Sequence, residues 1–600
     1  MPSVRFLFHY ILLACAFVFL CEGCTSSDTN VTSKKTNDNS VLIHQLGDAD
    51  YLNPIISTSA NASYIQLDIF QSLLDIDFNS LELKGQLAVD RPLVKDLSSG
   101  PYAGGMSLDF EIRPEAVWDN GTPITASDVA FTIKAIKNPK VNSGSQRPYF
   151  EFVDAIEADA TNPKKFTVLS KKKYFMAEVS FGGLTIMPEY VYDPKGLLKE
   201  FSIAQLSNPQ DTSRLGNNPK LKAFAEEFNS PKFSREKGFV VGSGPYSFEG
   251  WETGQSITLK RKANWWGDKV KDSGDVLQAR PDKLVYKVIT DWTTAVTSMK
   301  DEGLDVAYGI RNSDFIDLQK NNRFKKLYNL SSPTQLSYDY LGFNTKNPKF
   351  KDKKVRRALA HLVDKKEIID VLLYGMGEGV IGPIHPTKPY YDKDLAPIEF
   401  DVDKAKALLK EAGWEDTDGN GIVDKEIDGQ KTEMKFTLKY NQGNDRRKNI
   451  CLLFRENARR AGVDVEVLVR EWTVFLEENK RREFDMFCGG WVQSPQPDDL
   501  KQIWHTESDT PDGSNYVGFG TPESDKVIEE ISVTLDENKR NELYKRIQEI
   551  IYDEQPYIFL VSPKERIAIH NRFEDTQVSI RRPGFNEKTF KLVPAATAAQ

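Results

Sequence analysis

One short acidic stretch, residues 416–424, has the spacing of a calcium-binding loop. Oxygen atoms fall at positions 1, 3, 5, 7 and 9 of the loop, and Gly421 occupies position 6, where such loops turn sharply. Position 12 is Ile427, so the usual bidentate carboxylate is missing. The stretch therefore fits either a structural calcium site or an aspartate-and-glycine turn that needs no ion. The calcium hypothesis names Asp416, Asp418, Asn420, Ile422 and Asp424 as ligands.

Catalytic signatures are missing from the sequence. It contains no Gly-x-Ser-x-Gly nucleophile elbow, no His-Glu-x-x-His zinc motif and no phosphate-binding Gly-x-x-x-x-Gly-Lys loop. A Ser-x-x-Lys spacing occurs at residues 170–173, but the three consecutive lysines there indicate a solvated basic cluster. No two histidines beyond the N-terminal region have the spacing of metal ligands. We therefore predict a protein that is not an enzyme and requires no cofactor.

Two cysteines, Cys451 and Cys488, lie in the body of the chain, because the other three fall within the first 24 residues. We expect Cys451 on a helix and Cys488 on a neighbouring strand. A disulfide between them would be compatible with an oxidising compartment, but the sequence does not fix their separation. Two buried free thiols are the favoured interpretation.

The composition is that of a large protein with several domain-sized units. The chain has 600 residues, of which 40% are hydrophobic and 28% charged. Its formal net charge is −8, whereas a nucleic-acid-binding protein is expected to carry an excess of basic residues. A length of this order suggests about three to five compact units.

The N-terminus resembles a bacterial lipoprotein signal. Arg5 precedes an apolar run at residues 6–20, which has the length of a signal-peptide core and is short for a membrane-spanning helix. Gly23 and Cys24 match the junction at which such signals are cleaved, although the usual leucine is displaced by one residue to Leu20. We predict a signal peptide at 1–23, lipidation of Cys24, and a lipid-anchored, disordered tether at 24–40. The alternative is simple cleavage and release.

The elements that would position a site are clearest in the second half of the chain. Alternating patterns predict strands at 338–343, 434–440 and 463–469, and helices at 355–363, 402–412, 446–461 and 473–480. This alternation indicates a mostly parallel sheet with covered faces. In the first half we expect a helix at 63–75 and another that begins with a capping box at Thr125 and Asp128.

Residues 484–500 combine an apolar run, two glycines, a tryptophan and a polar loop. The apolar run is typical of a strand buried on both faces, and Gly489 and Gly490 allow another backbone to come close. Trp491 then leads into a loop that contains two prolines. Alone, the stretch favours a core strand followed by a surface turn. The alternative interpretation is the wall of a binding cleft.

Nine short motifs, taken in order, resemble the extracellular solute-binding proteins of the peptide and nickel class, known as family 5, which serve ABC importers. Each motif alone is weak, whereas the ordered series extends over most of the chain. The motifs lie at residues 50–54, 118–131, 242–246, 264–267, 340–345, 355–360, 364–369, 405–414 and 513–516.

This resemblance implies an α/β, two-lobed fold of the periplasmic-binding-protein type. Its mixed sheets would be flanked by helices, and the chain would cross between the lobes twice. The implied boundaries are 41–85, 201–290 and 556–600 for the core of lobe I, 86–200 for an extra subdomain of lobe I, and 291–555 for lobe II.

The resemblance also implies where a ligand would bind. Main-chain groups of Gly490, Trp491 and Val492 would pair with an extended ligand. In peptide-binding relatives an acid three residues after the tryptophan captures the ligand's ammonium group, but here that residue is Ser494. A hydroxyl cannot replace a charge pair, so an acid of lobe I would have to do so. The full set of predicted ligand-binding residues is Asp48, Ala49, Asp50, Tyr338, Tyr340, Gly490, Trp491, Val492, Gln493 and Ser494.

The resemblance implies a monomeric substrate-binding lipoprotein that delivers an extended ligand to the permease of an ABC importer. An oligopeptide is the favoured ligand, and a non-peptide solute such as an oligosaccharide, opine or metal chelate is the alternative. An envelope hydrolase and an adhesion or signalling lipoprotein are further alternatives. The expected location is the cell envelope, anchored to a membrane and facing the periplasm or the exterior.

Overall fold

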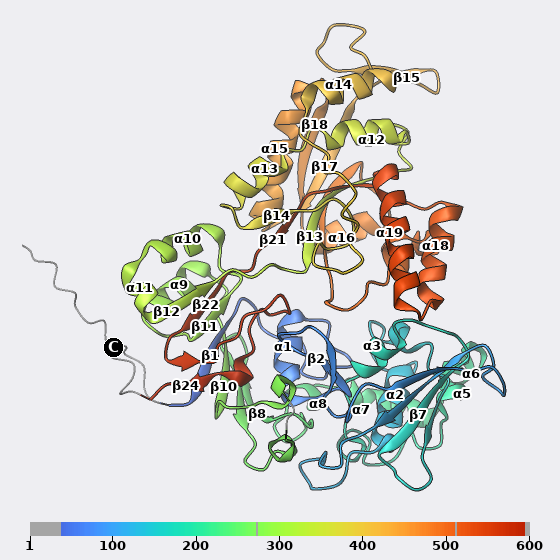
Figure 1. Ribbon diagram of the computed structural model, residues 1–600, viewed down its shortest axis with the longest axis vertical. Coiled ribbons are helices and arrows are strands. Elements are labelled where there is room, and N and C mark those ends of the chain that lie inside the picture. Colours follow the sequence, from blue (N-terminus) through green and yellow to red (C-terminus); the bar gives the residue numbers. More distant parts are fainter. Residues whose placement is uncertain (1–37, 272–273, 511–512, 595–600) are drawn as a thin grey trace, which may run out of the picture.

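The computed structural model describes residues 38–271, 274–510 and 513–594, which form two lobes, one above the other in Figure 1. Lobe I is built around a seven-stranded sheet and lobe II around a five-stranded sheet, so the predicted two-lobed α/β fold is confirmed. The predicted signal peptide, Cys24 and nearly all of the tether lie outside the described residues. Among the described helices, none combines the length and the apolar character needed to cross a bilayer.

The sheet of lobe I collects strands from distant parts of the chain. Its order is β12-β22-β11-β1-β10-β9-β8, and β1 (Ser40–Gln45) runs parallel to both of its neighbours. Five of the six residues of β1 are buried, because an interior parallel strand is covered on both faces. The other strands are β8 (Tyr246–Glu252), β9 (Ser256–Arg261), β10 (Lys283–Val288), β11 (Val306–Tyr308), β12 (Tyr328–Ser331) and β22 (Ile567–His570).

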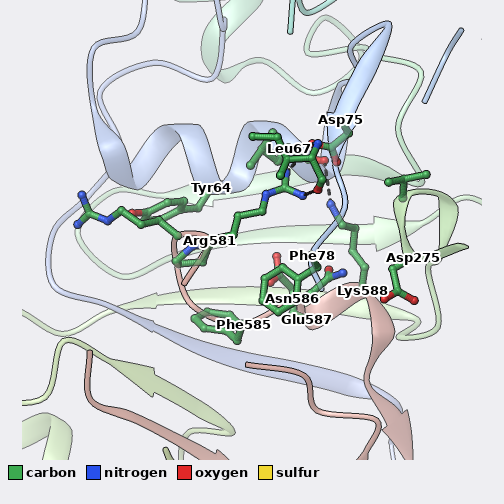
Figure 2. A pocket seen from close by; sticks show the side chains of 14 residues that line it. Tyr64, Leu67, Asp75, Phe78, Asp275, Arg581, Phe585, Asn586, Glu587 and Lys588 are labelled. Carbon is green, nitrogen blue, oxygen red and sulfur yellow. Dashed lines mark hydrogen bonds and ion pairs between the residues drawn. The ribbon is translucent and has the colours of Figure 1, made fainter. Parts of the chain in front are cut away.

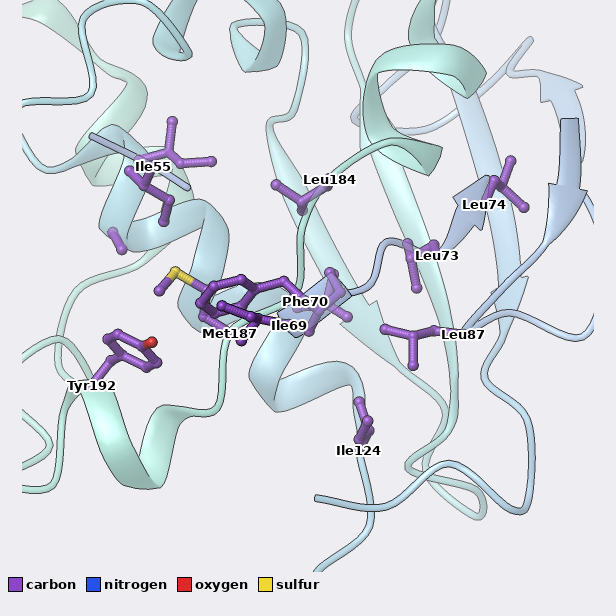
Figure 3. Packing of buried hydrophobic residues seen from close by; sticks show 14 of the residues in the cluster. Ile55, Ile69, Phe70, Leu73, Leu74, Leu87, Ile124, Leu184, Met187 and Tyr192 are labelled. Atoms are coloured by element: carbon purple, nitrogen blue, oxygen red, sulfur yellow. The ribbon is translucent and has the colours of Figure 1, made fainter. Parts of the chain in front are cut away.

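The extra subdomain of lobe I contains a four-stranded antiparallel sheet, β4-β5-β7-β6. Helix α2 (Ala126–Lys137) packs against it and begins at the predicted capping box of Thr125 and Asp128. The apolar core of the subdomain is continuous with that around α1 (Ala60–Ile69), because Leu184 and Met187 belong to the same buried cluster as Ile69 and Phe70 (Figure 3). The strands are β4 (Leu93–Asp96), β5 (Met106–Glu111), β6 (Ala155–Ala158) and β7 (Lys165–Ser170).

Two local boundaries in lobe I differ from the prediction. The helix expected at 63–75 ends at Ile69, because residues 74–76 instead form β2 (Leu74–Ile76), which pairs with β3 (Leu83–Gly85). The subdomain also continues past residue 200, since Lys137 of α2 donates a hydrogen bond to Ser207 of α5 (Ile203–Ser207) at 2.8 Å.

The sheet of lobe II has the order β18-β17-β19-β13-β20 and is mixed. Its first two pairings are parallel and its last two are antiparallel. The strands and helices predicted for this half are present, with ends that shift by a few residues. They include β13 (Ser337–Phe343), β17 (Lys435–Asn441), β18 (Asp464–Arg470), β19 (Met486–Val492), α12 (Lys353–Ala360), α14 (Val402–Glu411), α15 (Asp445–Arg460) and α16 (Trp472–Lys480). Lobe II also contains β20 (Tyr557–Phe559), α18 (Pro522–Val533) and α19 (Glu537–Glu554), which were not predicted.

The described chain passes between the lobes at residues 332–336 and at residues 564–566, here called the crossover segments. The two segments lie side by side, because Thr334 and Lys564 form an antiparallel bridge. The expected boundaries at 290 and 556 were wrong. Strands β11 and β12 still belong to the sheet of lobe I, and β20 still belongs to that of lobe II. Such short strands carry too little periodicity to reveal their sheet.

Candidate functional site

Strand β19 has one paired side and one side that is largely open. It pairs with β13 along its whole length, from Ser337↔Val492 to Phe343↔Met486. On its other side it pairs with β17 only at Met486 and Phe487. The last five residues of β19 therefore have no neighbouring strand on that side in the described part of the chain.

The direction of the main-chain groups follows from the register. Gln493 donates its N–H to the carbonyl of Leu336 at 2.8 Å, so residue 493 faces β13. Because main-chain groups alternate in direction along an antiparallel strand, those of Gly490 and Val492 face away from β13. Among the described residues, none forms a hydrogen bond with these groups. Two N–H and two C=O groups are thus free to bind an extended chain.

Trp491 lies against a buried aromatic cluster. Its ring is stacked between Tyr340, at 6.5 Å, and Tyr516, at 6.1 Å, and its indole N–H donates to the hydroxyl of Tyr557 at 3.3 Å. Tyr338 and Tyr340, which we predicted to contact the ligand, are only 3% and 2% exposed. Neither ring is placed for that role, because both pack in the core of lobe II, where Tyr340 stacks on Trp491 and Tyr338 lies against Phe559.

A buried charge cluster, which the sequence analysis missed, lies next to Gly490. Asp339 of β13 is 2% exposed, and its carboxylate pairs with Arg446 at 2.7 Å and Arg447 at 3.7 Å. A Cβ atom at Gly490 would come within 2.8 Å of Arg447 Nη2 and 2.9 Å of Asp339 Oδ1. The absence of a Cβ at Gly490 therefore leaves room for these two side chains. An aspartate inside an otherwise apolar strand was the signal that could have revealed the cluster.

The loop after β19 is fixed by a buried lysine. Lys388 donates to the carbonyl oxygens of Ser494 and Gln496, and its ammonium lies 3.6 Å from Asp498. Burial lowers the pKa of Lys388 and raises that of Asp498, and each charge partly offsets the shift of the other. The side-chain amide of Gln493 also donates to Asp498, at 3.4 Å. Both predicted contacts in this loop, Gln493 and Ser494, are thus held within lobe II.

The acids predicted in lobe I already have hydrogen-bond donors. Asp48 accepts from the indole N–H of Trp251 at 2.9 Å, and Asp50 accepts from the hydroxyl of Ser57 at 2.6 Å. Each also accepts a main-chain N–H of lobe I, while Ala49 packs on the core. In the described part of the chain, these three residues share no hydrogen bond or ion pair with β19. The carboxylates of Asp48 and Asp50 therefore stabilise the conformation of the loop that contains them.

The acidic loop brings three of its predicted ligands together. Carboxylate oxygens of Asp416, Asp418 and Asp424 lie within 4.8 Å of one another. Asn420 instead accepts a hydrogen bond from the main-chain N–H of Ile422 at 2.8 Å, as in an aspartate-and-asparagine turn.

A lysine already contributes positive charge to this loop. The ammonium of Lys431 lies 2.7 Å from Asp418 and 3.3 Å from Asp424. Lys431 comes from the β-hairpin that follows the loop, so it is invisible to a spacing motif. A bound calcium ion would have to displace this ammonium group.

A separate pocket lies within lobe I (Figure 2). Arg581 crosses it to reach Asp75 at 2.5 Å, and Lys588 donates to the carbonyl of Leu67 at 3.3 Å. Its free space of about 40 Å³ holds only a few water molecules. The pocket is therefore too small for a peptide.

One serine and one histidine form a hydrogen-bonded pair of the kind used in nucleophilic catalysis. His385 Nε2 lies 3.1 Å from Ser562 Oγ. The two residues are 1% and 0% exposed, and His385 Nδ1 faces the hydroxyl of Thr387 instead of a carboxylate. Because a substrate cannot reach the serine and no acid orients the histidine, this pair is structural.

Cys451 of α15 and Cys488 of β19 are buried free thiols, which is the arrangement we favoured. Each lies within hydrogen-bonding reach of the other, and burial raises the pKa of Cys451 well above its usual range. A thiol with a raised pKa carries little of the reactive thiolate. The two thiols are therefore chemically unreactive and contribute to the packing of the lobe II core.

Comparisons with known proteins agree with this geometry. The model of the bacterial extracellular solute-binding proteins, family 5 Middle, matches residues 98–514. The oligopeptide-binding protein AppA of Bacillus subtilis is 29% identical over 588 residues, which cover 96% of each chain. Its solved structure in complex with a nonapeptide gives a TM-score of 0.69 at 27% identity, covering 92% of this chain and 99% of that one.

A second solved structure shares the fold at lower identity. NikA from Brucella suis, in complex with Fe(III)-EDTA, gives a TM-score of 0.74 at 20% identity, and the match covers 92% of this chain and 100% of that one. The fold thus occurs with both a peptide and a metal chelate, and the ligand must be argued from the residues of this chain.

Proposed function

The chain belongs to the bacterial extracellular solute-binding proteins of family 5, and from this premise we propose that it binds an extended oligopeptide between its two lobes. The observation that carries the proposal is the open side of β19. Gly490 and Val492 present both donors and acceptors there, which is the pattern a peptide main chain complements. A metal chelate or an oligosaccharide offers no such alternating series.

Binding through main-chain groups makes affinity largely independent of the peptide's sequence. Trp491 adds an amphipathic surface, since its ring is only partly buried. The ligand is held and not transformed, in keeping with relatives that are binding proteins. Binding energy stabilises the closed arrangement of the lobes, which an ABC permease then recognises. We propose that Cys24 carries the lipid that keeps the protein at the membrane.

The ligand's N-terminus is expected to contribute little. Ser494 is neutral, and its main-chain carbonyl is held by Lys388. Asp48 and Asp50 are engaged within lobe I. A captured ammonium would be worth roughly 1.5–3 kcal/mol, or about 13- to 160-fold in Kd. We therefore expect an N-acetylated peptide to bind within about threefold of the same peptide with a free amine.

The direct experiment is mass spectrometry of ligand that copurifies with the protein, followed by calorimetric titration of the peptide that it identifies. Val492→Pro removes an N–H that the sheet does not use, whereas Val492→Ala keeps it. Loss of one neutral hydrogen bond predicts a Kd about 2- to 13-fold weaker for proline. Equal Kd values for the two variants would refute pairing at β19. A chelate or sugar as the only copurified ligand would refute the peptide itself.

A further inference from the structure

The lobes touch at a place remote from the crossover segments. Residues 174 and 175, which follow β7, contact helices α18 and α19 of lobe II, the helices that lie directly above the subdomain of lobe I in Figure 1. The main-chain N–H of Phe175 donates to the carbonyl of Ser532 at 3.0 Å. The Phe175 ring packs on the apolar cluster of lobe II, and the guanidinium of Arg540 lies 5.3 Å from its centre. One main-chain hydrogen bond and one aromatic contact thus connect the two lobes at this place.

Tyr174, the residue before Phe175, makes a polar contact across the same boundary between the lobes. Its hydroxyl donates to Asp499 Oδ2 at 3.2 Å, and burial together with this carboxylate raises the pKa of Tyr174. The tyrosine therefore remains a hydrogen-bond donor throughout the physiological range. A third contact runs from the side-chain amide of Gln496 to the carbonyl of Leu81 in lobe I, at 3.0 Å.

Two of these contacts involve the loop that continues the ligand-pairing strand. Gln496 and Asp499 lie four and seven residues after Val492. Lys388 fixes the shape of this loop by donating to the carbonyl of Gln496, and its buried ammonium resists being moved. The open side of β19 and the contact between the lobes are thus mechanically connected through one short, rigid segment.

We propose that Tyr174 and Phe175 form a closure latch, which holds the lobes together on the side opposite the crossover segments. With the crossovers alone, the lobes are free to rotate about one edge. The latch adds a second attachment that exists only when the lobes are closed. It therefore sets the population of the closed state before any ligand arrives, which goes beyond the proposed function.

Amide hydrogen exchange tests the latch without any ligand. Within the described part of the chain, the N–H of residue 175 bonds only to Ser532 across the lobes, so its protection measures how often the latch is closed. In dialysed, ligand-free protein we expect this amide to exchange at least about tenfold slower than its intrinsic rate. Phe175→Ala keeps the N–H but removes the ring, and we expect exchange about tenfold faster than in the wild type. Tyr174→Phe, which removes one hydroxyl, should accelerate it by about threefold.

Two controls separate latch opening from unfolding. Tyr190→Ala truncates an exposed aromatic ring of the same subdomain, and it should leave exchange at residue 175 unchanged. The N–H of Leu560, which bonds to Asp339 inside lobe II at 3.0 Å, should remain protected in every variant. If Phe175→Ala exposes both amides, lobe II has unfolded and Tyr174→Phe decides. Exchange at the intrinsic rate in the wild type, or unchanged exchange in the variants, would overturn the latch.

Discussion

Replacing Asp305 with alanine is expected to destabilise lobe I strongly, because it removes the buried carboxylate that pairs most closely with the guanidinium of Arg572 and leaves only the more distant, exposed Asp38 as its acidic partner among the contacts described. Asp305 is 0% exposed, and its carboxylate accepts Nε and Nη2 of Arg572 at 2.7 and 2.9 Å. The same carboxylate accepts the main-chain N–H of Leu42 at 2.8 Å. Arg572 in turn donates to the carbonyls of Asp38 and Ser40. The ion pair between Asp305 and Arg572 thus connects β1, the start of β11 and the end of β22 within the sheet of lobe I.

The magnitude follows from the environment of the pair. Arg572 is only 8% exposed, so water cannot replace the lost carboxylate. Removing one partner of a buried ion pair costs about 3–5 kcal/mol, whereas replacing both by apolar groups is close to neutral. We therefore expect Asp305→Ala to lose about 3–5 kcal/mol of unfolding free energy. The double variant Asp305→Leu/Arg572→Met should recover most of that loss.

Guanidinium-induced unfolding, followed by circular dichroism, measures these differences in unfolding free energy as shifts of the midpoint of the unfolding transition. The matched control is Asp370→Ala, which breaks a surface ion pair with Lys366 and should cost at most about 0.5 kcal/mol. A double variant as unstable as the sum of its single variants would show that the two charges do not compensate each other. A single variant that costs less than about 1 kcal/mol would refute the assumed burial penalty.

Three further outcomes are expected. Burial and the nearby carboxylate of Glu587 raise the pKa of Asp68 above its ordinary value of 3.8. Its contribution to stability is therefore present at low pH and lost as the pH rises through the raised pKa, so Asp68→Asn should be more stable than the wild type at pH 8 and less dependent on pH in thermal unfolding. Cys451 and Cys488 should react with Ellman's reagent only after denaturation, because both are 0% exposed, and rapid reaction of the native protein would contradict their burial. If the acidic loop binds calcium, Lys431→Met should tighten binding in a calcium titration by removing the competing ammonium, and absence of binding in both proteins would eliminate the site.

Several features of the binding edge were accessible from the sequence because they are local. The apolar run and glycines at 484–490 identify a buried strand, and the capping residues Thr125 and Asp128 mark a helix start. The side of β19 that is open could not be deduced in this way. It depends on where β17 diverges, which is set by pairing between residues almost 50 positions apart, Leu438 with Met486.

The roles of individual side chains also depended on distant neighbours. Tyr338 and Tyr340 were predicted to contact a ligand, but β20 packs against both rings, with Phe559 beside Tyr338 and Tyr557 stacked on Tyr340. Asp339 stands out in the sequence as an acid in an apolar strand, but only the tertiary structure identifies its partner, Arg446 of α15. Charge pairing of this kind is invisible to spacing rules, because the partners are more than 100 residues apart.

By itself, the sequence determined the family, the local elements and the lack of a catalytic motif, since each of these is carried by residues close together in the chain. The tertiary structure decided where the chain changes lobe, which main-chain groups of Gly490 and Val492 are free, and that Tyr174 and Phe175 reach across to lobe II. These properties arise from register and from packing between remote segments. Short strands and single aromatic residues in loops have no pattern that identifies their partners before the chain has folded.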